Sequence, residues 1–255
     1  MAAATGGDHG GGGFPDPMHQ FEIQQLVPLN IFNIDASFTN SSLFMVIVIL
    51  LISLFLFLSV KSRSLVPGRM QSVAEIGYEF IANMIRENVG TAGMKYFPFI
   101  FTLFVFVLGC NMLGMIPYSF TVTSHIIITF ALAAVVFIGV TIIGFIKHGF
   151  GFLKFFVPSG VPTLLLPLLV VIEVISYLTR PISLSVRLFA NMMAGHTMLK
   201  VFGSVVFAMG IWGGWAPLIF MIPFTGLEIL VAFLQAYVFA ILTCIYLNDA
   251  LHMHH

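Results

Sequence analysis

The sequence predicts an all-α membrane protein with five transmembrane crossings, the last two long and strongly tilted, plus one amphipathic surface helix. Hydrophobic residues make up 59% of the 255 residues, charged residues make up only 8%, and the mean hydropathy is +1.06. These values lie far outside the range of soluble proteins. The apolar residues are gathered in runs that are each long enough, as helices, to cross a hydrocarbon core about 30 Å thick.

Residues 1–40 are mostly polar and are expected to form an extracytoplasmic segment ahead of a single helical membrane domain at 41–255. In that domain, residues 43–60 form an apolar run just long enough to span the membrane at about 1.5 Å per residue. Residues 70–88 differ, because polar and apolar side chains recur there at helical spacing. This pattern is typical of an amphipathic helix that lies on the membrane surface.

Residues 97–116 and 125–146 are two further predicted spans, and the short, uncharged turn between them joins them as a hairpin. The next apolar segment, 162–207, would be roughly 70 Å long as one helix, and the last, 215–248, about 50 Å. Neither can stand upright in a hydrocarbon core of about 30 Å. We therefore expect both to be slanted and side by side, with Pro181 as the natural place for a kink.

Basic residues are distributed unevenly between the two sides of this topology. Seven of the ten Lys and Arg lie in segments on one side: Lys61, Arg63, Arg69, Arg86, Lys95, Lys147 and Lys154. The segments on the opposite side, 1–40, 117–124 and 208–214, contain none. Because cytoplasmic segments carry the excess of Lys and Arg, we expect the N-terminus outside and the C-terminus in the cytoplasm.

Charged and titratable side chains interrupt the apolar segment 162–207 at Glu173, Arg180, Arg187, His196 and Lys200. A charge in the membrane core costs from about 3 to more than about 10 kcal/mol, so such residues point to function. Arg180 has a candidate partner in Glu173, two turns earlier. Arg187 has no acid three or four positions away, although a guanidinium stays protonated at any accessible pH. Its charge therefore implies a carboxylate supplied by another protein.

The last segment carries Glu228 and Gln235, which are seven residues apart and share one helix face. If the two long segments are antiparallel, His196 and Glu228 lie at comparable distances from the turn that joins them. Histidine and glutamate are well suited to carry protons near neutral pH. Together with Asn191 and Gln235, this pair can line a wet half-channel that opens to the outside.

Structural roles are the alternative for these side chains. They are a packing ion pair for Glu173 with Arg180, a hydrogen bond between helices for Asn191 with Gln235, and a hydrogen-bonded core histidine for His196. The spans show no Cys and His spacing typical of a metal site, and the chain has no glycine-rich phosphate loop. We therefore expect no metal, no cofactor and no nucleotide, and the net charge of zero argues against a nucleic-acid partner.

The residues from Arg187 to His196 read RLFANMMAGH and resemble the R-L-x-x-N-x-x-A-G-[EH] signature of subunit a of the F-type ATP synthase. Other segments resemble the same family, including NMLGMIP at 111–117, PISL at 181–184 and LQAY at 234–237. The resemblance covers nearly the whole chain from residue 30 onward. Many bacterial members have an acid where His196 stands and a histidine where Glu228 stands. The exchanged pair in this chain resembles the mitochondrial and alphaproteobacterial type.

This resemblance implies a proton-translocating stator subunit that is not itself an enzyme. Arg187 would face a ring of c subunits, whose carboxylates would pass it one by one as the ring turns. The outer half-channel would include Asn191, His196, Glu228 and Gln235, and the inner one Glu173 and Arg180. The implied partners are the c-ring, peripheral-stalk b-type subunits, the rest of the F-type ATP synthase, the lipid bilayer and protons. The implied location is the bacterial inner membrane, with the mitochondrial inner membrane as the alternative.

Two other functions compete with this interpretation. A free-standing ion channel or secondary transporter is the main alternative, but many such transporters are built from internal repeats with interrupted helices. We find no such repeat in this sequence. A membrane scaffold is the third possibility, and it would have no need of an unpaired arginine deep in an apolar segment.

Overall fold

The computed structural model describes residues 25–27, 30–31, 34–35, 37–61, 67–116, 120–157 and 165–252. Five of the helices in these ranges are long and apolar enough to cross a membrane, which confirms the predicted class. The α-helices are α1 (Asn40–Lys61), α2 (Arg69–Asn88), α3 (Phe97–Gly114), α4 (Ile126–His148), α5 (Leu166–Gly213) and α6 (Trp215–Leu251). Short 3-10 helices connect them: η2 (Thr91–Tyr96), η3 (Val122–Ser124) and η4 (Gly149–Phe156).

Four short strands precede α1, and the sequence did not predict them. Strand β1 (Gln25–Val27) pairs with β4 (Phe38–Thr39), and β2 (Asn30–Ile31) pairs with β3 (Ile34–Asp35), both antiparallel. Most of the predicted extracytoplasmic segment lies outside the described residues, as does Arg63 among the basic residues used to orient the chain. The extracytoplasmic placement of this segment therefore stays a prediction.

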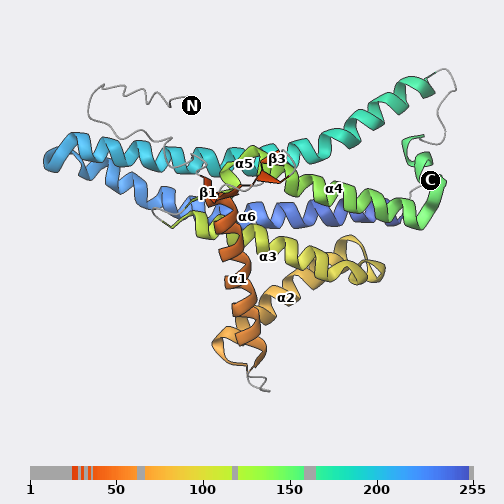
Figure 1. The fold of residues 1–255 in the computed structure, drawn as a ribbon, viewed down its shortest axis with the longest axis horizontal. Coiled ribbons are helices and arrows are strands. Elements are labelled where there is room, and N and C mark those ends of the chain that lie inside the picture. Colours follow the sequence, from red (N-terminus) through yellow and green to blue (C-terminus); the bar gives the residue numbers. More distant parts are fainter. Residues whose placement is uncertain are drawn as a thin grey trace.

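The long helices form one layer that α1 crosses. In Figure 1, α3, α4, α5 and α6 run side by side along the longest axis of the molecule, while α1 lies across their direction. Helix α1 has 22 residues, a length that suits an upright span. Helices α5 and α6 have 48 and 37 residues and cannot stand parallel to it within the same bilayer. The arrangement agrees with the prediction that the last two crossings are strongly tilted.

Helix α5 has two irregularities, one of which was predicted from Pro181. Figure 1 shows it changing direction in its first half, and Pro181 is the proline inside it. Proline removes one hydrogen bond of the helix backbone and bends it. The backbone leaves the helical conformation at Gly210, whose φ of 59° is a left-handed value that suits glycine. The chain reverses there into α6, so α5 and α6 form an antiparallel hairpin.

The surface helix α2 is amphipathic, as predicted. Its buried side is formed near its C-terminal end by Ile81, Ala82, Met84 and Ile85. Glu75, Glu79 and Arg86 are all exposed. This helix packs against α1, α3 and α6.

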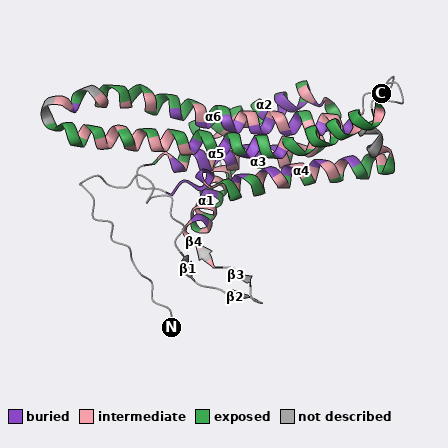
Figure 2. Ribbon diagram, turned by 90° about the horizontal axis from the view of Figure 1, so that it is seen from above, coloured by how far each residue is buried: buried purple, intermediate pink, exposed green. Residues whose placement is uncertain are grey.

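The packing inside the layer determines which side of α5 is buried and which side is exposed. Leu184, Leu188 and Met192 recur every four residues along α5, and each is at most 1% exposed. On α6, Ala232, Ala236 and Ala240 follow the same spacing and are fully buried. Small residues at this spacing let helices in a membrane approach closely. Figure 2 shows the buried residues gathered in the middle of the layer, where α6 packs against α3 and α5, and the side of α5 that faces away from them is exposed.

Candidate functional site

Arg187 lies on the exposed side of α5, one residue before the buried Leu188. None of the ion pairs between described residues involves its guanidinium. The residues around it on the same side are small or polar and also exposed, namely Ser183, Ala190, Asn191 and Ala194. Small residues allow another helix to come close, and Arg187 would then present its charge to that helix. The arrangement therefore supports the inference that its partner lies outside this chain.

Asn191, about one helical turn after Arg187, connects α5 to Gln235 on α6. The Asn191 side-chain amide donates a hydrogen bond to Gln235 Oε1 over 3.0 Å. Gln235 is 3% exposed, and its Nε2 has no hydrogen-bond partner among the described residues. The interhelical hydrogen bond that the sequence suggested is present. It also leaves a buried donor available for a further polar group, which a purely structural pair would not need.

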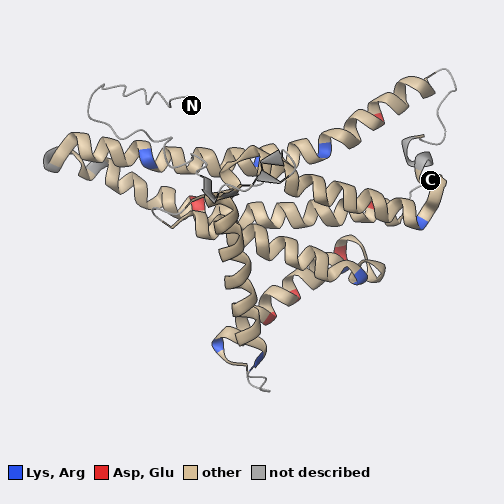
Figure 3. Ribbon diagram, in the orientation of Figure 1, with Lys and Arg blue, Asp and Glu red and all other residues tan. Residues whose placement is uncertain are grey.

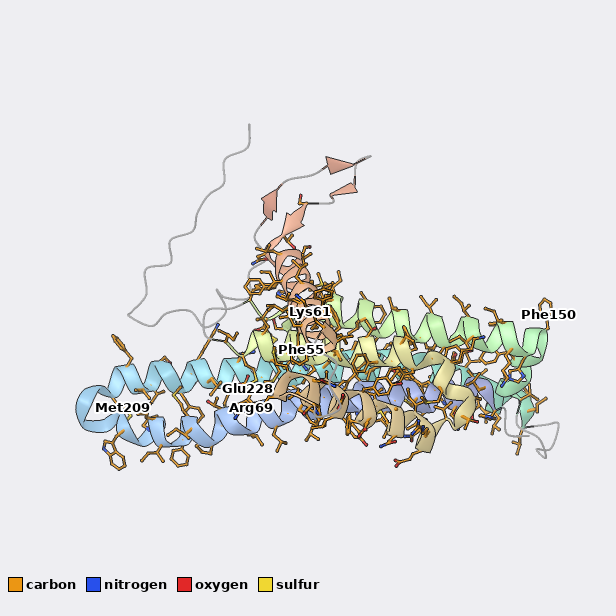
Figure 4. All side chains as sticks on the ribbon, turned by 90° about the horizontal axis from the view of Figure 1, so that it is seen from below. Phe55, Lys61, Arg69, Phe150, Met209 and Glu228 are labelled. Carbon is orange, nitrogen blue, oxygen red and sulfur yellow. The ribbon has the colours of Figure 1, made fainter. Side chains whose placement is uncertain are left out.

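His196 and Glu228 face each other across the same two helices, as the sequence predicted. Their Nδ1 and Oε1 atoms are 3.4 Å apart, and both side chains are largely buried. Neither carboxyl oxygen of Glu228 has a hydrogen-bond partner among the described residues. Figure 4 shows Glu228 well inward from the hairpin end at which Met209 lies. A buried acid beside an imidazole can exchange a proton with it, because both groups titrate near neutral pH in suitable surroundings.

Glycine at position 195 is what allows Glu228 to lie so close to α5. A Cβ at Gly195 would be 2.8 Å from Glu228 Oε1 and 3.2 Å from its carboxyl carbon. A cavity of about 270 Å³ adjoins this contact, lined by Asn191, Gly195 and Glu228 together with apolar residues of both helices. The cavity has room for several water molecules, and Asn191 and Glu228 are the polar side chains in its lining. It is suited to a wet path that reaches Glu228.

Arg180 has a different partner from the one expected. The sequence indicated Glu173, but the guanidinium forms an ion pair with Asp249, with Nη1 3.0 Å from Oδ2. The same group also lies over the rings of Tyr177 and Tyr246, at 5.5 and 5.0 Å from their centroids. The physical reason is the antiparallel hairpin, which brings the C-terminal end of α6 beside the first part of α5. These contacts fix the guanidinium between the two helices.

Glu173 is half-buried on α5 and takes part in none of the ion pairs or hydrogen bonds between described residues. It precedes Arg180 by two helical turns, whereas Asn191 and His196 follow Arg187. Along α5, the polar residues therefore form one group on each side of Arg187, at separations of about 6 to 21 Å. Figure 3 shows how few charges the long helices carry apart from these.

The turn between α3 and α4 supplies polar contacts that the sequence did not predict. Thr121 Oγ1 lies 3.2 Å from His196 Nε2, and Thr123 donates a hydrogen bond to Asn111 Oδ1 over 3.0 Å. Asn111 in turn donates to the backbone oxygen of Ala232 on α6 over 3.2 Å. The uncharged turn looked like an external loop. The signal that could have revealed these contacts is the presence of several hydroxyl side chains in the turn, because such side chains can form hydrogen bonds to neighbouring helices.

The sequence is similar over nearly its whole length to known proteins. A family model described as ATP synthase A chain matches residues 42–248. The ATP synthase subunit a of Pelagibacter ubique is 65% identical over 241 residues, which cover 94% of this chain and 99% of that protein. The subunit a of Parvibaculum lavamentivorans is 61% identical over 259 residues, which cover 99% and 100%. That of Rhizobium rhizogenes is 62% identical over 242 residues, which cover 92% and 97%.

The matched region contains all seven residues singled out from the sequence, namely Glu173, Arg180, Arg187, Asn191, His196, Glu228 and Gln235. The similarity extends over nearly the full length of these relatives, so it concerns the whole membrane domain and not one motif. The chain therefore belongs to the family of ATP synthase A chains, the subunit a of the ATP synthase.

Proposed function

We propose that this chain, the proton-translocating stator subunit of an F-type ATP synthase, moves protons through two half-channels that Arg187 separates. A ring of c subunits would carry the protons between them on its carboxyl groups. The observation that carries the proposal is that Arg187 is exposed on α5, has no acidic partner among the described residues and lies among small or polar side chains. A moving carboxylate of the ring would supply the missing partner.

The charge of Arg187 would perform two tasks. A fixed cation favours the ionised form of a carboxyl group that arrives beside it, so the group releases its proton. The same cation repels protons and thus blocks a direct path from one half-channel to the other. Protons would then cross only by travelling with the ring. Each proton yields about 2.3 kcal/mol per 100 mV of membrane potential.

The outer half-channel would consist of Asn191, His196, Glu228 and Gln235. The cavity beside Glu228, the close approach of His196 and the unpaired Nε2 of Gln235 support this assignment. The inner half-channel would include Glu173 and Arg180. Glu173 would be its proton-carrying group, because Arg180 is already engaged by Asp249 and two tyrosine rings.

The surroundings of the chain follow from the same function. Its role is non-catalytic, with b-type subunits of the peripheral stalk as further partners. The inner membrane of a bacterium is its location, with the N-terminus outside and the C-terminus in the cytoplasm. The basic residues around α1, α2 and the end of α4 support this orientation. The named relatives come from bacteria, which favours this location over the mitochondrial inner membrane.

Cysteine cross-linking tests the proposed partner. An Ala190→Cys variant places a thiol on the exposed side of α5 beside Arg187, and a second cysteine is placed next to the carboxyl residue of the c subunit. Mild oxidation of the assembled complex should join the two chains in a reducible product. The unsubstituted chain is the control, because its Cys110 and Cys244 are both buried and should not react. Absence of the product in a fully assembled complex would contradict the proposed interface.

A Gly195→Ala substitution tests the outer half-channel. The added Cβ would force the flexible Glu228 carboxyl away from its position near His196, so we expect ATP-driven proton pumping to fall about tenfold. The measurement is acidification of inverted vesicles, with the amount of assembled complex determined in parallel. Gly203→Ala on the same helix is the matched control, because no atom lies within 4 Å of its added Cβ. Equal pumping by the two variants would show that the position of Glu228 does not matter.

A further inference from the structure

The hydroxyl group of Thr121 lies within hydrogen-bond distance of two groups, but it has only one proton to donate. Thr121 is 1% exposed, and its Oγ1 lies 3.3 Å from the backbone oxygen of Gly114 and 3.2 Å from His196 Nε2. A carbonyl oxygen can only accept a hydrogen bond, so the hydroxyl proton points to Gly114. The Thr121 oxygen then has lone pairs, but no proton, for His196. If the contact of 3.2 Å is a hydrogen bond as well, Nε2 of His196 is its donor and carries a hydrogen.

The opposite nitrogen of the same ring faces Glu228. His196 Nδ1 lies 3.4 Å from Glu228 Oε1. A neutral imidazole carries one N–H group, and if Nε2 holds it, Nδ1 has a free lone pair. Glu228 in its protonated form can therefore donate its proton to Nδ1. The products would be an imidazolium and a carboxylate, and the reverse transfer restores the neutral pair.

The position of Thr121 is fixed from both sides. Its backbone oxygen accepts a hydrogen bond of 2.6 Å from the Ser124 hydroxyl. Its methyl group fits against Gly114, where a Cβ would come within 2.8 Å of it. Two residues further on, Thr123 is tied through Asn111 to the backbone of α6. The turn is thus anchored to the helix that carries Glu228. Thr121 therefore cannot follow the imidazole of His196 if that side chain turns.

We propose that Thr121 is a positioning residue that holds His196 with its hydrogen on Nε2, so that Nδ1 is free to take a proton from Glu228 Oε1, 3.4 Å away. The proposal rests on the proposed function of this pair in the outer half-channel. Protons then enter and leave the pair at the carboxyl side, beside the cavity, and the Nε2 hydrogen is not exchanged during transport.

Nitrogen NMR of the assembled complex tests the proposal directly, because protonated and unprotonated ring nitrogens have clearly different chemical shifts. The signal of His196 is assigned by its loss in a His196→Gln variant, since the chain has eight histidines. In the unsubstituted protein, neutral His196 should carry hydrogen on Nε2. A neutral ring with hydrogen on Nδ1 would overturn the proposal without any Thr121 variant.

Two substitutions separate positioning from packing. Thr121→Val keeps the branched shape against Gly114 but removes the hydroxyl, and should shift His196 toward the Nδ1–H form with about tenfold slower pumping. Thr121→Ser keeps the hydroxyl and should preserve both the tautomer and most of the pumping. An unchanged tautomer in Thr121→Val would overturn the proposal. A changed tautomer with normal pumping would leave Thr121 as a positioning residue but contradict the proposed role of the pair in transport.

Discussion

Replacement of Arg187 by alanine is expected to abolish ATP-driven proton pumping while passive proton leak through the membrane sector persists or increases. The side chain is exposed on α5 between two groups of polar residues, so its loss removes the charge that separates them. Removing one partner of a desolvated ion pair typically costs about 3 kcal/mol or more, which corresponds to about a 100-fold loss in rate. The expected effect is the largest that any single substitution in this chain should produce.

Both quantities can be measured on the same inverted vesicles. ATP-driven acidification is recorded with the catalytic head attached, and proton leak is recorded after the head has been removed. Arg86→Ala is a matched control, because Arg86 is an exposed arginine on the surface helix α2. Arg187→Lys is informative as well, since lysine keeps the charge but loses the planar two-pronged geometry of arginine. Near-normal pumping by Arg187→Ala in a fully assembled complex would show that the arginine is structural.

The second large effect is expected from exchanging His196 and Glu228. His196→Glu places two acids 3 to 4 Å apart, and Glu228→His places two imidazoles there, so neither variant keeps one acid and one base. We expect each single variant to pump about tenfold to 100-fold more slowly. The double variant restores an acid beside an imidazole, and it should recover most of the lost activity.

The recovery is the decisive result, because two harmful substitutions would otherwise combine to a greater loss. Initial rates of acidification are compared at equal amounts of assembled complex. Thr225→Ala on α6 is a suitable control, since Thr225 is exposed and its hydroxyl bonds to the backbone of its own helix. A double variant no more active than either single variant would show that the two side chains act separately or only through packing.

The helices and two of the three expected polar contacts could be predicted because they depend on distances along single segments. The lengths of the apolar runs determine the number of crossings and require the last two to tilt. Counting residues from the turn between the last two helices was enough to place His196 beside Glu228, since both helices rise by the same distance per residue. The hydrogen bond between Asn191 and Gln235 follows from the same register.

The partner of Arg180 could not be found in this way. Glu173 was the nearest acid along the segment, but Asp249 is nearest in space, and it lies one residue beyond the predicted end of the last span. The turn after α3 was missed for a related reason. Its residues Thr121 and Thr123 carry no charge and show no helical pattern, so their place against His196 and Asn111 depends on how the hairpin packs. Both errors concern contacts between segments that local patterns do not encode.

The continuous helix α5 also has a mechanical consequence. Arg187 and His196 lie on the part of α5 between the bend at Pro181 and the break at Gly210, and Glu173 lies before that bend. Fully buried alanines of α6 pack beside this part of α5. A rotor that pushes sideways against Arg187 would act on a helix packed against α6, and neither a loop nor a proline separates Arg187 from His196. Their spacing would thus be maintained under torque. Elastic compliance during rotation would have to reside elsewhere in the assembly.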